Sequence, residues 1–260
     1  MVPILTYHSV GRLNPILDTP IEKFESHLKA FAEKGYTSVT LSDLVALISS
    51  RKTLPAKTLV LTFDDGYKAF HSEAWPLLKK YGFTATVFLI SDYCGKDNRW
   101  IGQPDSVPTA PLLTWDEVAL LSKEGCEFGG HTSNHLPLST ISGERLTREL
   151  VQSKERIQEA TNKDVTTFAY PYGDTTGDAV REVQKHYQGA VSTDLGISSS
   201  ESNPYLLPRI DSYYLTQEWI DNLEKPWFRP YLGFRQMLRR AKRMVQPDWQ
   251  PDEYRNLSMN

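Results

Sequence analysis

The chain has 260 residues, of which 40% are hydrophobic and 23% are charged, and its formal net charge at pH 7 is -3. This length is enough for one large domain or two small ones with a substantial core, and the charge balance argues against nucleic-acid binding. The two cysteines, Cys94 and Cys126, are too few for a disulfide framework, so we expect two reduced thiols near buried strands.

The start of the chain shows no pattern of a secretory leader. Met1 leads through Pro3 into a strand-like run, without a basic segment followed by a long apolar stretch. The apolar runs LVALI and TVFLI are far shorter than the ~20 residues that span a bilayer. We therefore expect a cytoplasmic protein, and a chain from which a leader had been removed would show the same pattern.

Short strand-like runs alternate with helical patterns along most of the chain. The runs are VPILTY, YTSVTL, TLVLTF, TATVFLI, CEFGG, VTTFAY, GAVS and YLLPRI. Such alternation is typical of a parallel sheet covered by helices, and about eight strands fit a single distorted or incomplete α/β barrel. An open doubly wound sheet is the alternative, although no GxGxxG turn follows the first strand.

Three helical patterns have clear boundaries. One helix is expected after Thr19, which we take as its N-cap. Another is expected at TWDEVALLSKEG, where Thr114 and Glu117 form a capping box. The longest, at residues 143–160, is heavily charged and is expected to face solvent on one side. The glycine- and proline-rich residues 92–112 are expected to form a long loop near the mouth of the barrel.

The stretch LVLTFDDGYKAF ends a strand on two carboxylates. Residues 59–63 are apolar enough for a strand buried on both faces, and Asp64 and Asp65 follow at its end. Two adjacent carboxylates there repel each other and lose hydration, so they need a cation or hydrogen-bond donors. Sites in α/β barrels form at the C-terminal ends of strands, but Asp-Asp-Gly also suits a solvated turn.

The stretch CEFGGHTSNHLPL places two histidines after another strand. The four-residue spacing of His131 and His135 is expected to bring both imidazoles to one side of a short helical turn, which Pro137 limits. An HxxxH pattern is a weak signal by itself. Together with a carboxylate from the Asp-Asp pair, it supplies the two nitrogens and one oxygen typical of a catalytic zinc site.

The stretch TTFAYPYGD ends a third strand on Tyr170, Pro171 and Tyr172. The proline fixes the direction of the chain, so a backbone N–H just after it can point into a site. Such an N–H can donate to a carbonyl oxygen that becomes tetrahedral. By itself the sequence also fits an ordinary β-turn.

These three stretches, in this order in one α/β chain, resemble the NodB-homology polysaccharide deacetylases, carbohydrate esterase family 4. TFDDG, HTxxH and PYG carry the likeness, and PILTYHSV and LPRI resemble the subgroup that deacetylates poly-N-acetylglucosamine-type exopolysaccharides. The resemblance implies a distorted (β/α) TIM-like barrel of the NodB-homology type. It also implies removal of N-acetyl groups with one divalent metal ion, which is Zn²⁺ or, alternatively, Co²⁺ or Ni²⁺.

The resemblance also assigns roles to the motif residues. It implies that Asp65, His131 and His135 bind the metal and that Asp64 is the general base. It further implies that the Tyr172 backbone amide donates to the oxyanion. These roles agree with metal-assisted activation of water, and the departing nitrogen then needs a proton from an acid.

The need for a general acid suggests a role for the histidine at the end of the first strand. Many members take it from a C-terminal Leu-x-His motif, but the last histidine here, His186, lies in a helical stretch. In the exopolysaccharide subgroup the strand order is circularly permuted, and the histidine comes from the first strand. We therefore expect His8 to be the general acid, with a structural role as the alternative. His27 and His71 fall in helical stretches and are expected at the surface.

One residue of the family pattern, an arginine, is absent from this chain. Many members have an arginine two residues before the proline of the third motif, where it orients the base, and that position is Ala169 in this chain. Arg209, in LPRID at the end of a later strand, is either its replacement or an exposed residue. We take Tyr170, Pro171 and Arg209 as the substrate-binding candidates.

The C-terminal segment PWFRPYLGFRQMLRRAKRMVQPDW differs from the rest of the chain. It contains six basic residues before its first acid, Asp248, interleaved with aromatic residues. Such a helix either lies in an anionic lipid interface, near a lipid-linked glycan precursor, or packs on the barrel with a solvated basic side. We expect a barrel domain in residues 1–215 and a basic, aromatic helical extension in residues 216–260.

The expected function is metal-dependent N-deacetylation of N-acetylhexosamine units in an exopolysaccharide or its lipid-linked precursor. The expected partner is an acetylated amino-sugar polysaccharide or oligosaccharide. An O-acetyl carbohydrate esterase uses the same residues, whereas a two-metal phosphohydrolase fits less well, because one carboxylate and two histidines suit one ion. A catalytically inactive glycan-binding relative is a further alternative, which the missing arginine at Ala169 favours.

Overall fold

The computed structural model describes residues 1–12 and 18–245, and the side chains of its last helix as far as Ala241. Seven parallel strands form a closed barrel, because β1 pairs with both β10 and β5. In spatial order they are β1 (Ile4–Tyr7), β10 (Leu207–Asp211), β9 (Gly189–Leu195), β8 (Thr167–Ala169), β7 (Glu127–Gly130), β6 (Thr86–Leu89) and β5 (Thr58–Phe63). The predicted distorted barrel is confirmed, and the open doubly wound sheet is excluded.

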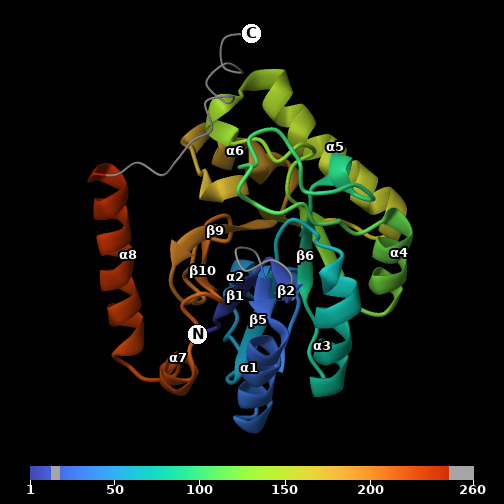
Figure 1. Cartoon of the computed structure of the whole chain (residues 1–260). Coiled ribbons are helices and arrows are strands. Elements are labelled where there is room, and N and C mark those ends of the chain that lie inside the picture. Colours follow the sequence, from blue (N-terminus) through green and yellow to red (C-terminus); the bar gives the residue numbers. More distant parts are fainter. Residues whose placement is uncertain (13–17, 246–260) are drawn as a thin grey trace.

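Helices surround this barrel (Figure 1). They are α1 (Ile21–Glu33), α2 (Leu41–Ser49), α3 (Trp75–Tyr81), α4 (Trp115–Lys123), α5 (Gly143–Thr161) and α6 (Gly177–His186), followed by α7 (Gln217–Asn222) and α8 (Phe228–Val245). Shorter elements are the strands β2 (Ser9–Gly11), β3 (Asp18–Pro20) and β4 (Thr37–Ser38), and the turns η1 (Phe70–Ala74), η2 (Ser91–Tyr93), η3 (Leu138–Thr140) and η4 (Pro171–Gly173). The segment 92–112 is mostly irregular, as expected for a long loop.

The helix signals of the sequence are largely confirmed. The predicted capping box starts α4, since the Glu117 amide donates to Thr114 and the Glu117 carboxylate accepts from the Thr114 amide. The prediction for α1 is wrong in one detail. Pro20 is its N-cap, and the hydroxyl of Thr19 bonds Ser212 Oγ over 3.0 Å.

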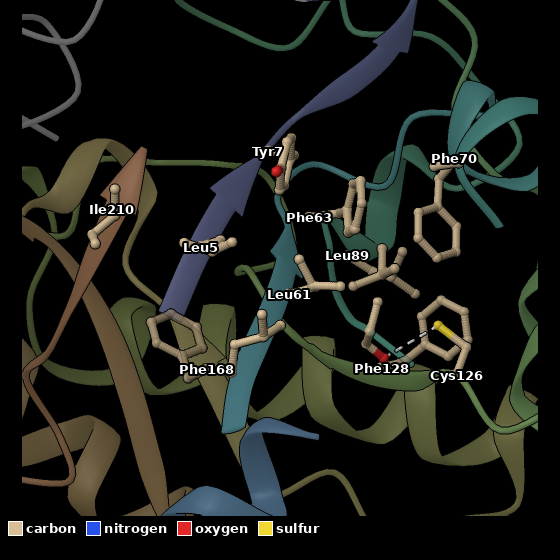
Figure 2. Close-up of a cluster of buried hydrophobic side chains, with 14 of the residues drawn as sticks. Leu5, Tyr7, Leu61, Phe63, Phe70, Leu89, Cys126, Phe128, Phe168 and Ile210 are labelled. Carbon is tan, nitrogen blue, oxygen red and sulfur yellow. Dashed lines mark hydrogen bonds between the residues drawn. The ribbon is translucent and has the colours of Figure 1, made fainter. Parts of the chain in front are cut away.

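Between the barrel and its outer helices lies the main apolar core. Strand side chains that face outward, such as Leu5, Leu61 and Phe168, pack in a continuous buried cluster with residues of the helices (Figure 2). Cys126 belongs to this cluster, and it and the half-buried Cys94 are free cysteines.

A second buried cluster fills the N-terminal end of the barrel interior. Here Val45 of α2 packs with strand residues such as Ile4 and Val60. Leu41, at the start of α2, donates its amide to the carboxylate of Glu127, the first residue of β7. Helix α2 therefore covers the N-terminal end of the barrel interior.

The surface prediction for His27 is wrong. His27 is buried on α1, and its Nδ1 lies 3.0 Å from the hydroxyl of Tyr7. It occupies the same helical face as Phe24, Leu28 and Phe31, which form the buried side of α1. The spacing of these four residues carries the signal for burial.

Candidate active site

The barrel interior changes from apolar to polar side chains toward the C-terminal ends of the strands. Alternate residues of a strand point to the same side, and Ile4, Val60 and Leu207 belong to the apolar cluster beside α2. The following alternate positions carry polar side chains, namely Thr6 and His8, Thr62 and Asp64, and Arg209 and Asp211. All of these except Thr62 line a pocket of about 290 Å³.

Three possible metal ligands converge in this pocket. Asp65 Oδ1 lies 3.4 Å from His131 Nε2 and 3.4 Å from His135 Nε2, and the two Nε2 atoms lie 3.2 Å apart. All three residues are buried. Ligands at zinc distances of about 2.0–2.1 Å stand about 3.3–3.4 Å apart in a tetrahedron. The donor set and its spacing therefore fit one tetrahedral metal ion that has one further coordination position.

Neighbouring groups orient both imidazoles. His131 Nδ1 lies 2.7 Å from the carbonyl oxygen of Ala169, which can only accept, so Nδ1 carries a proton. In the neutral ring, Nε2 then has the lone pair that a metal requires. His135 Nδ1 lies 2.9 Å from the hydroxyl of Tyr172, and the ring of Trp100 packs edge-on against this imidazole at 4.7 Å between centroids. Such partners fix the orientation of metal-binding histidines.

The expected helical turn between the two histidines is wrong. Residues 131–135 form a loop in which Thr132 and His135 have left-handed backbone conformations, with φ of 65° and 58°. The amide of His135 donates to Thr132 Oγ1 over 2.8 Å. The left-handed region is unfavourable for residues with a Cβ atom, so contacts outside the loop must stabilise it.

Glu149 of α5 supplies those contacts. Its buried carboxylate accepts from the backbone amides of Ser133 and Asn134 over 3.0 and 2.9 Å. It also accepts from the side-chain amide of Asn134 over 2.9 Å. One carboxylate therefore accepts three hydrogen bonds that hold the loop carrying both histidines.

The adjacent aspartates take different directions. Asp64 continues the inward alternation of β5, whereas Asp65 has a left-handed φ of 70° and is followed by Gly66 at 73°. This turn brings Asp65 to His131 and His135 and leaves Asp64 facing β10.

Arg209 binds Asp64 with two parallel hydrogen bonds. Nη1 donates to Oδ1 over 2.7 Å and Nη2 donates to Oδ2 over 2.8 Å, while Nε donates to the carbonyl oxygen of Ser192. Burial raises the pKa of Asp64, but the Arg209 guanidinium outweighs it and holds that pKa below its usual value. Arg209 is only 4% exposed, so the alternative of an exposed arginine is wrong.

The metal-ligand candidates are electrostatically coupled. Burial lowers the pKa of His135 to about 3, so its imidazole is neutral. Burial raises the pKa of Asp65, but its contact with His131 and the electrostatic influence of the other nearby histidines outweigh burial, so the pKa lies below the usual value. The same contact raises the pKa of His131 although burial opposes it. A proton and a metal ion therefore compete for His131 Nε2.

The remaining predicted site residues are distributed around the same place. His8 is half-buried, directly follows β1 and lines the pocket. Tyr170 also lines it and donates its hydroxyl to the carbonyl oxygen of Tyr205 over 3.1 Å. Tyr172 has a left-handed φ of 58°, and its side chain is half exposed at the pocket. Pro171 is buried at the start of η4 and is not among the lining residues.

Several residues at this site were not predicted from the sequence, among them Glu149, Trp100 and Arg239. Glu149 takes a position on the apolar face of α5, between Leu146 and Ser153, and this spacing was the available signal for its burial. Trp100 comes from the long loop and Arg239 from the basic helix α8, and both line the pocket. No local pattern marks either of them.

Comparisons with known proteins agree with this geometry. A family model described as polysaccharide deacetylase matches residues 51–190, more than half of the chain. YxkH of Bacillus subtilis (strain 168) is 29% identical over 210 residues, which are 80% of this chain and 70% of that protein. The poly-beta-1,6-N-acetyl-D-glucosamine N-deacetylase of Staphylococcus aureus (strain MSSA476) is 25% identical over 79% of this chain and 70% of its own length.

A solved structure extends the likeness to the whole barrel. The Streptococcus pyogenes deacetylase PplD, in complex with acetate, superposes with a TM-score of 0.72 at 25% identity. The alignment covers 85% of this chain and 96% of that one. The matched family model, the barrel and the relatives lead to one assignment, and the chain belongs to the polysaccharide deacetylase family.

Proposed function

We propose that this chain is a metal-dependent hydrolase that removes N-acetyl groups from N-acetylglucosamine-type units of an exopolysaccharide or its lipid-linked precursor. The observation that carries the proposal is the convergence of Asp65, His131 and His135 at metal-ligand spacing, beside Asp64, which Arg209 holds. The Staphylococcus aureus relative, named as a poly-N-acetylglucosamine deacetylase, supports the substrate class.

Asp65, His131 and His135 would hold the metal. Zn²⁺ is the first candidate and Co²⁺ or Ni²⁺ are alternatives, since two imidazoles and one carboxylate suit all three ions. When bound, such an ion supplies Lewis-acid polarisation of a carbonyl oxygen and lowers the pKa of water.

The protein groups of the pocket complete the chemistry. Asp64 accepts a proton from the attacking water, in an orientation that its two bonds with Arg209 fix. The Tyr172 backbone N–H donates to the acetyl oxygen as negative charge develops there. His8 gives a proton to the amide nitrogen as the C–N bond breaks, and the products are acetate and a free amine.

Acetate release from N-acetylglucosamine oligomers tests this proposal. We expect release by the zinc-loaded protein, loss after chelation and recovery when metal is added back. Asp64→Asn should remove activity while the variant still binds one metal ion. Asp65→Asn should lose both activity and metal binding. Failure of the metal-loaded protein to release acetate with any of the three ions would contradict the proposal.

The same assay separates the two alternatives. An O-acetyl esterase would release acetate from O-acetylated sugars but not from the N-acetyl amide. An inactive relative would bind the oligomers without releasing acetate. The main argument for inactivity was the missing arginine at Ala169, and the pairing of Arg209 with Asp64 supplies an arginine to the base from another strand.

A further inference from the structure

Helix α8 has two apolar faces, and only one of them packs on the protein. Phe228 and Leu232 are buried in the main core cluster. On the same side, Gln236 accepts from the amide of Leu195 in β9 over 2.9 Å. Figure 1 shows α8 on the side of the barrel where β9 lies, and the two elements are in contact. The other face therefore needs a separate explanation.

The outer face of α8, together with Trp227 directly before the helix, carries an apolar stripe, which we define as Trp227, Phe234, Met237 and Leu238. Their exposed fractions are 53%, 54%, 57% and 48%. Met237 and Leu238 follow Phe234 at three and four residues, so these three share one side of the helix. Trp227 directly precedes the helix and packs against Tyr231. Large apolar side chains that gather on one face mark an interaction surface more often than scattered ones do.

The charge of α8 indicates what covers the stripe. The helix has six basic residues and no acidic one, in a chain whose net charge is -3. Arg229 and Arg240 are exposed on the flank of α8 between the stripe and the packed face, and Arg240 contacts Asp194 of β9. Arg235 and Arg239 point inward over the ring of Tyr214.

This charge distribution argues against a second copy of the chain as the occupant. A two-fold contact would place one α8 against another and bring the basic residues of both helices together without acids between them. An anionic lipid surface accepts both features, because its boundary region takes the apolar side chains and its phosphates attract the arginines.

We propose that α8 docks on an anionic membrane surface through the apolar stripe, while the phosphate groups of that surface attract the basic residues of the helix. The helix lies along the surface, and no helix of the described residues is both long and apolar enough to cross a bilayer. This inference does not depend on the proposed reaction.

The docked helix would also place the pocket beside the membrane. Arg239 of α8 lines the pocket, and its Nη1 lies 3.4 Å from the carbonyl oxygen of Thr193. The stripe is on the opposite side of the same helix, about 10 Å away, which is one helix diameter. A glycan held at a membrane surface would then reach the pocket along α8.

Vesicle sedimentation tests the docking surface. The full chain is mixed with phosphatidylcholine vesicles that contain or lack phosphatidylglycerol. We expect binding to the anionic vesicles that weakens in about 0.5 M NaCl. The double variant Phe234→Glu, Leu238→Glu should bind at least about 10-fold more weakly, since it buries charge instead of apolar surface.

Leu120→Glu is the matched control. Leu120 is 47% exposed on α4, against 48% for Leu238, so both changes place a new acid at an equally exposed leucine. The control should bind vesicles like the unchanged chain, and all variants should keep their circular dichroism. The proposal is overturned if the unchanged chain does not bind anionic vesicles. It is also overturned if the double variant binds them as tightly as the unchanged chain. A dimer in solution that only the double variant dissociates, without vesicle binding, would instead identify a second copy as the occupant.

Discussion

Arg209, on β10, forms two parallel hydrogen bonds with the carboxylate of Asp64, which follows β5, at 2.7 and 2.8 Å. The two residues are 145 positions apart in the chain. Closure of the barrel brings them together, because β1 pairs with both β5 and β10. At the position where many family members have the orienting arginine, Ala169 instead uses its carbonyl oxygen to orient His131.

Replacing Arg209 by lysine should slow turnover without removing the metal site. A lysine ammonium cannot form the two parallel bonds, so Asp64 loses its fixed orientation. We expect kcat for acetate release to fall about 10- to 100-fold, the usual cost of losing such a supporting partner, with metal content unchanged. Arg235→Lys, on an arginine that is not among the pocket-lining residues, is the control. Equal kcat values for both variants would show that Arg209 does not orient the base.

Removing the carboxylate of Glu149 should weaken metal binding. Glu149→Ala removes the carboxylate that accepts three hydrogen bonds from the loop carrying His131 and His135, and the left-handed residues of that loop then lose their support. We expect the metal affinity, measured by competition with a chelator, to fall about 10- to 100-fold. Glu155→Ala, exposed on the same helix, should leave the affinity unchanged. If Glu149→Ala binds metal as tightly as the Glu155 variant, the loop does not need this carboxylate.

Tyr172 offers a side chain and a backbone amide to the same site, and Tyr172→Phe separates their effects. The variant keeps the amide but removes the hydroxyl that lies 2.9 Å from His135 Nδ1. The metal affinity should fall by about 10-fold, because one orienting partner of His135 is lost. The kcat of the fully metal-loaded variant should stay close to that of the unchanged protein. A large loss of kcat at saturating metal would instead give the hydroxyl a direct part in the reaction.

The buried His27 should make folding stability depend on pH. Burial, and then the charge of Lys23, lower its pKa to about 4 from an unfolded value of about 6.5. Above pH 6.5 the imidazole is neutral in both states and has no effect. Between pH 6.5 and 4 the unfolded chain takes up the proton first, so this group lowers the free energy of unfolding by about 3 kcal/mol.

Denaturant unfolding of the metal-free protein at several pH values checks this effect. His27→Gln should flatten the fall in stability between pH 6.5 and 4, while His71→Gln, on a partly exposed histidine, should follow the unchanged chain. Parallel curves for His27→Gln and the unchanged chain would contradict the prediction.

The sequence could predict the barrel and the position of the site because both follow from local patterns. The buried run from Leu59 to Phe63 identifies a barrel strand, and the aspartates directly after it mark its C-terminal end. The same reasoning places His131 after β7 and Tyr170 after β8.

What the sequence could not predict depends on contacts between distant segments. The left-handed loop from His131 to His135 is stabilised by Glu149, and the orientation of Asp64 by Arg209. Glu149 and Arg209 are both far in the chain from the residues that they hold. Local propensity and spacing therefore favoured a helical turn for the histidine loop, and they left the role of Arg209 undecided. His27 was different, since its place among the apolar residues of α1 was visible in the sequence.

The measurement that tests the central claim most directly is an anomalous difference map from crystals of the zinc-loaded protein, recorded at the zinc absorption edge. We expect a single peak at about 2.0–2.2 Å from Asp65 Oδ1, His131 Nε2 and His135 Nε2, with Asp64 still paired with Arg209. No peak among these three atoms, or a peak that takes Asp64 as a ligand, would contradict it.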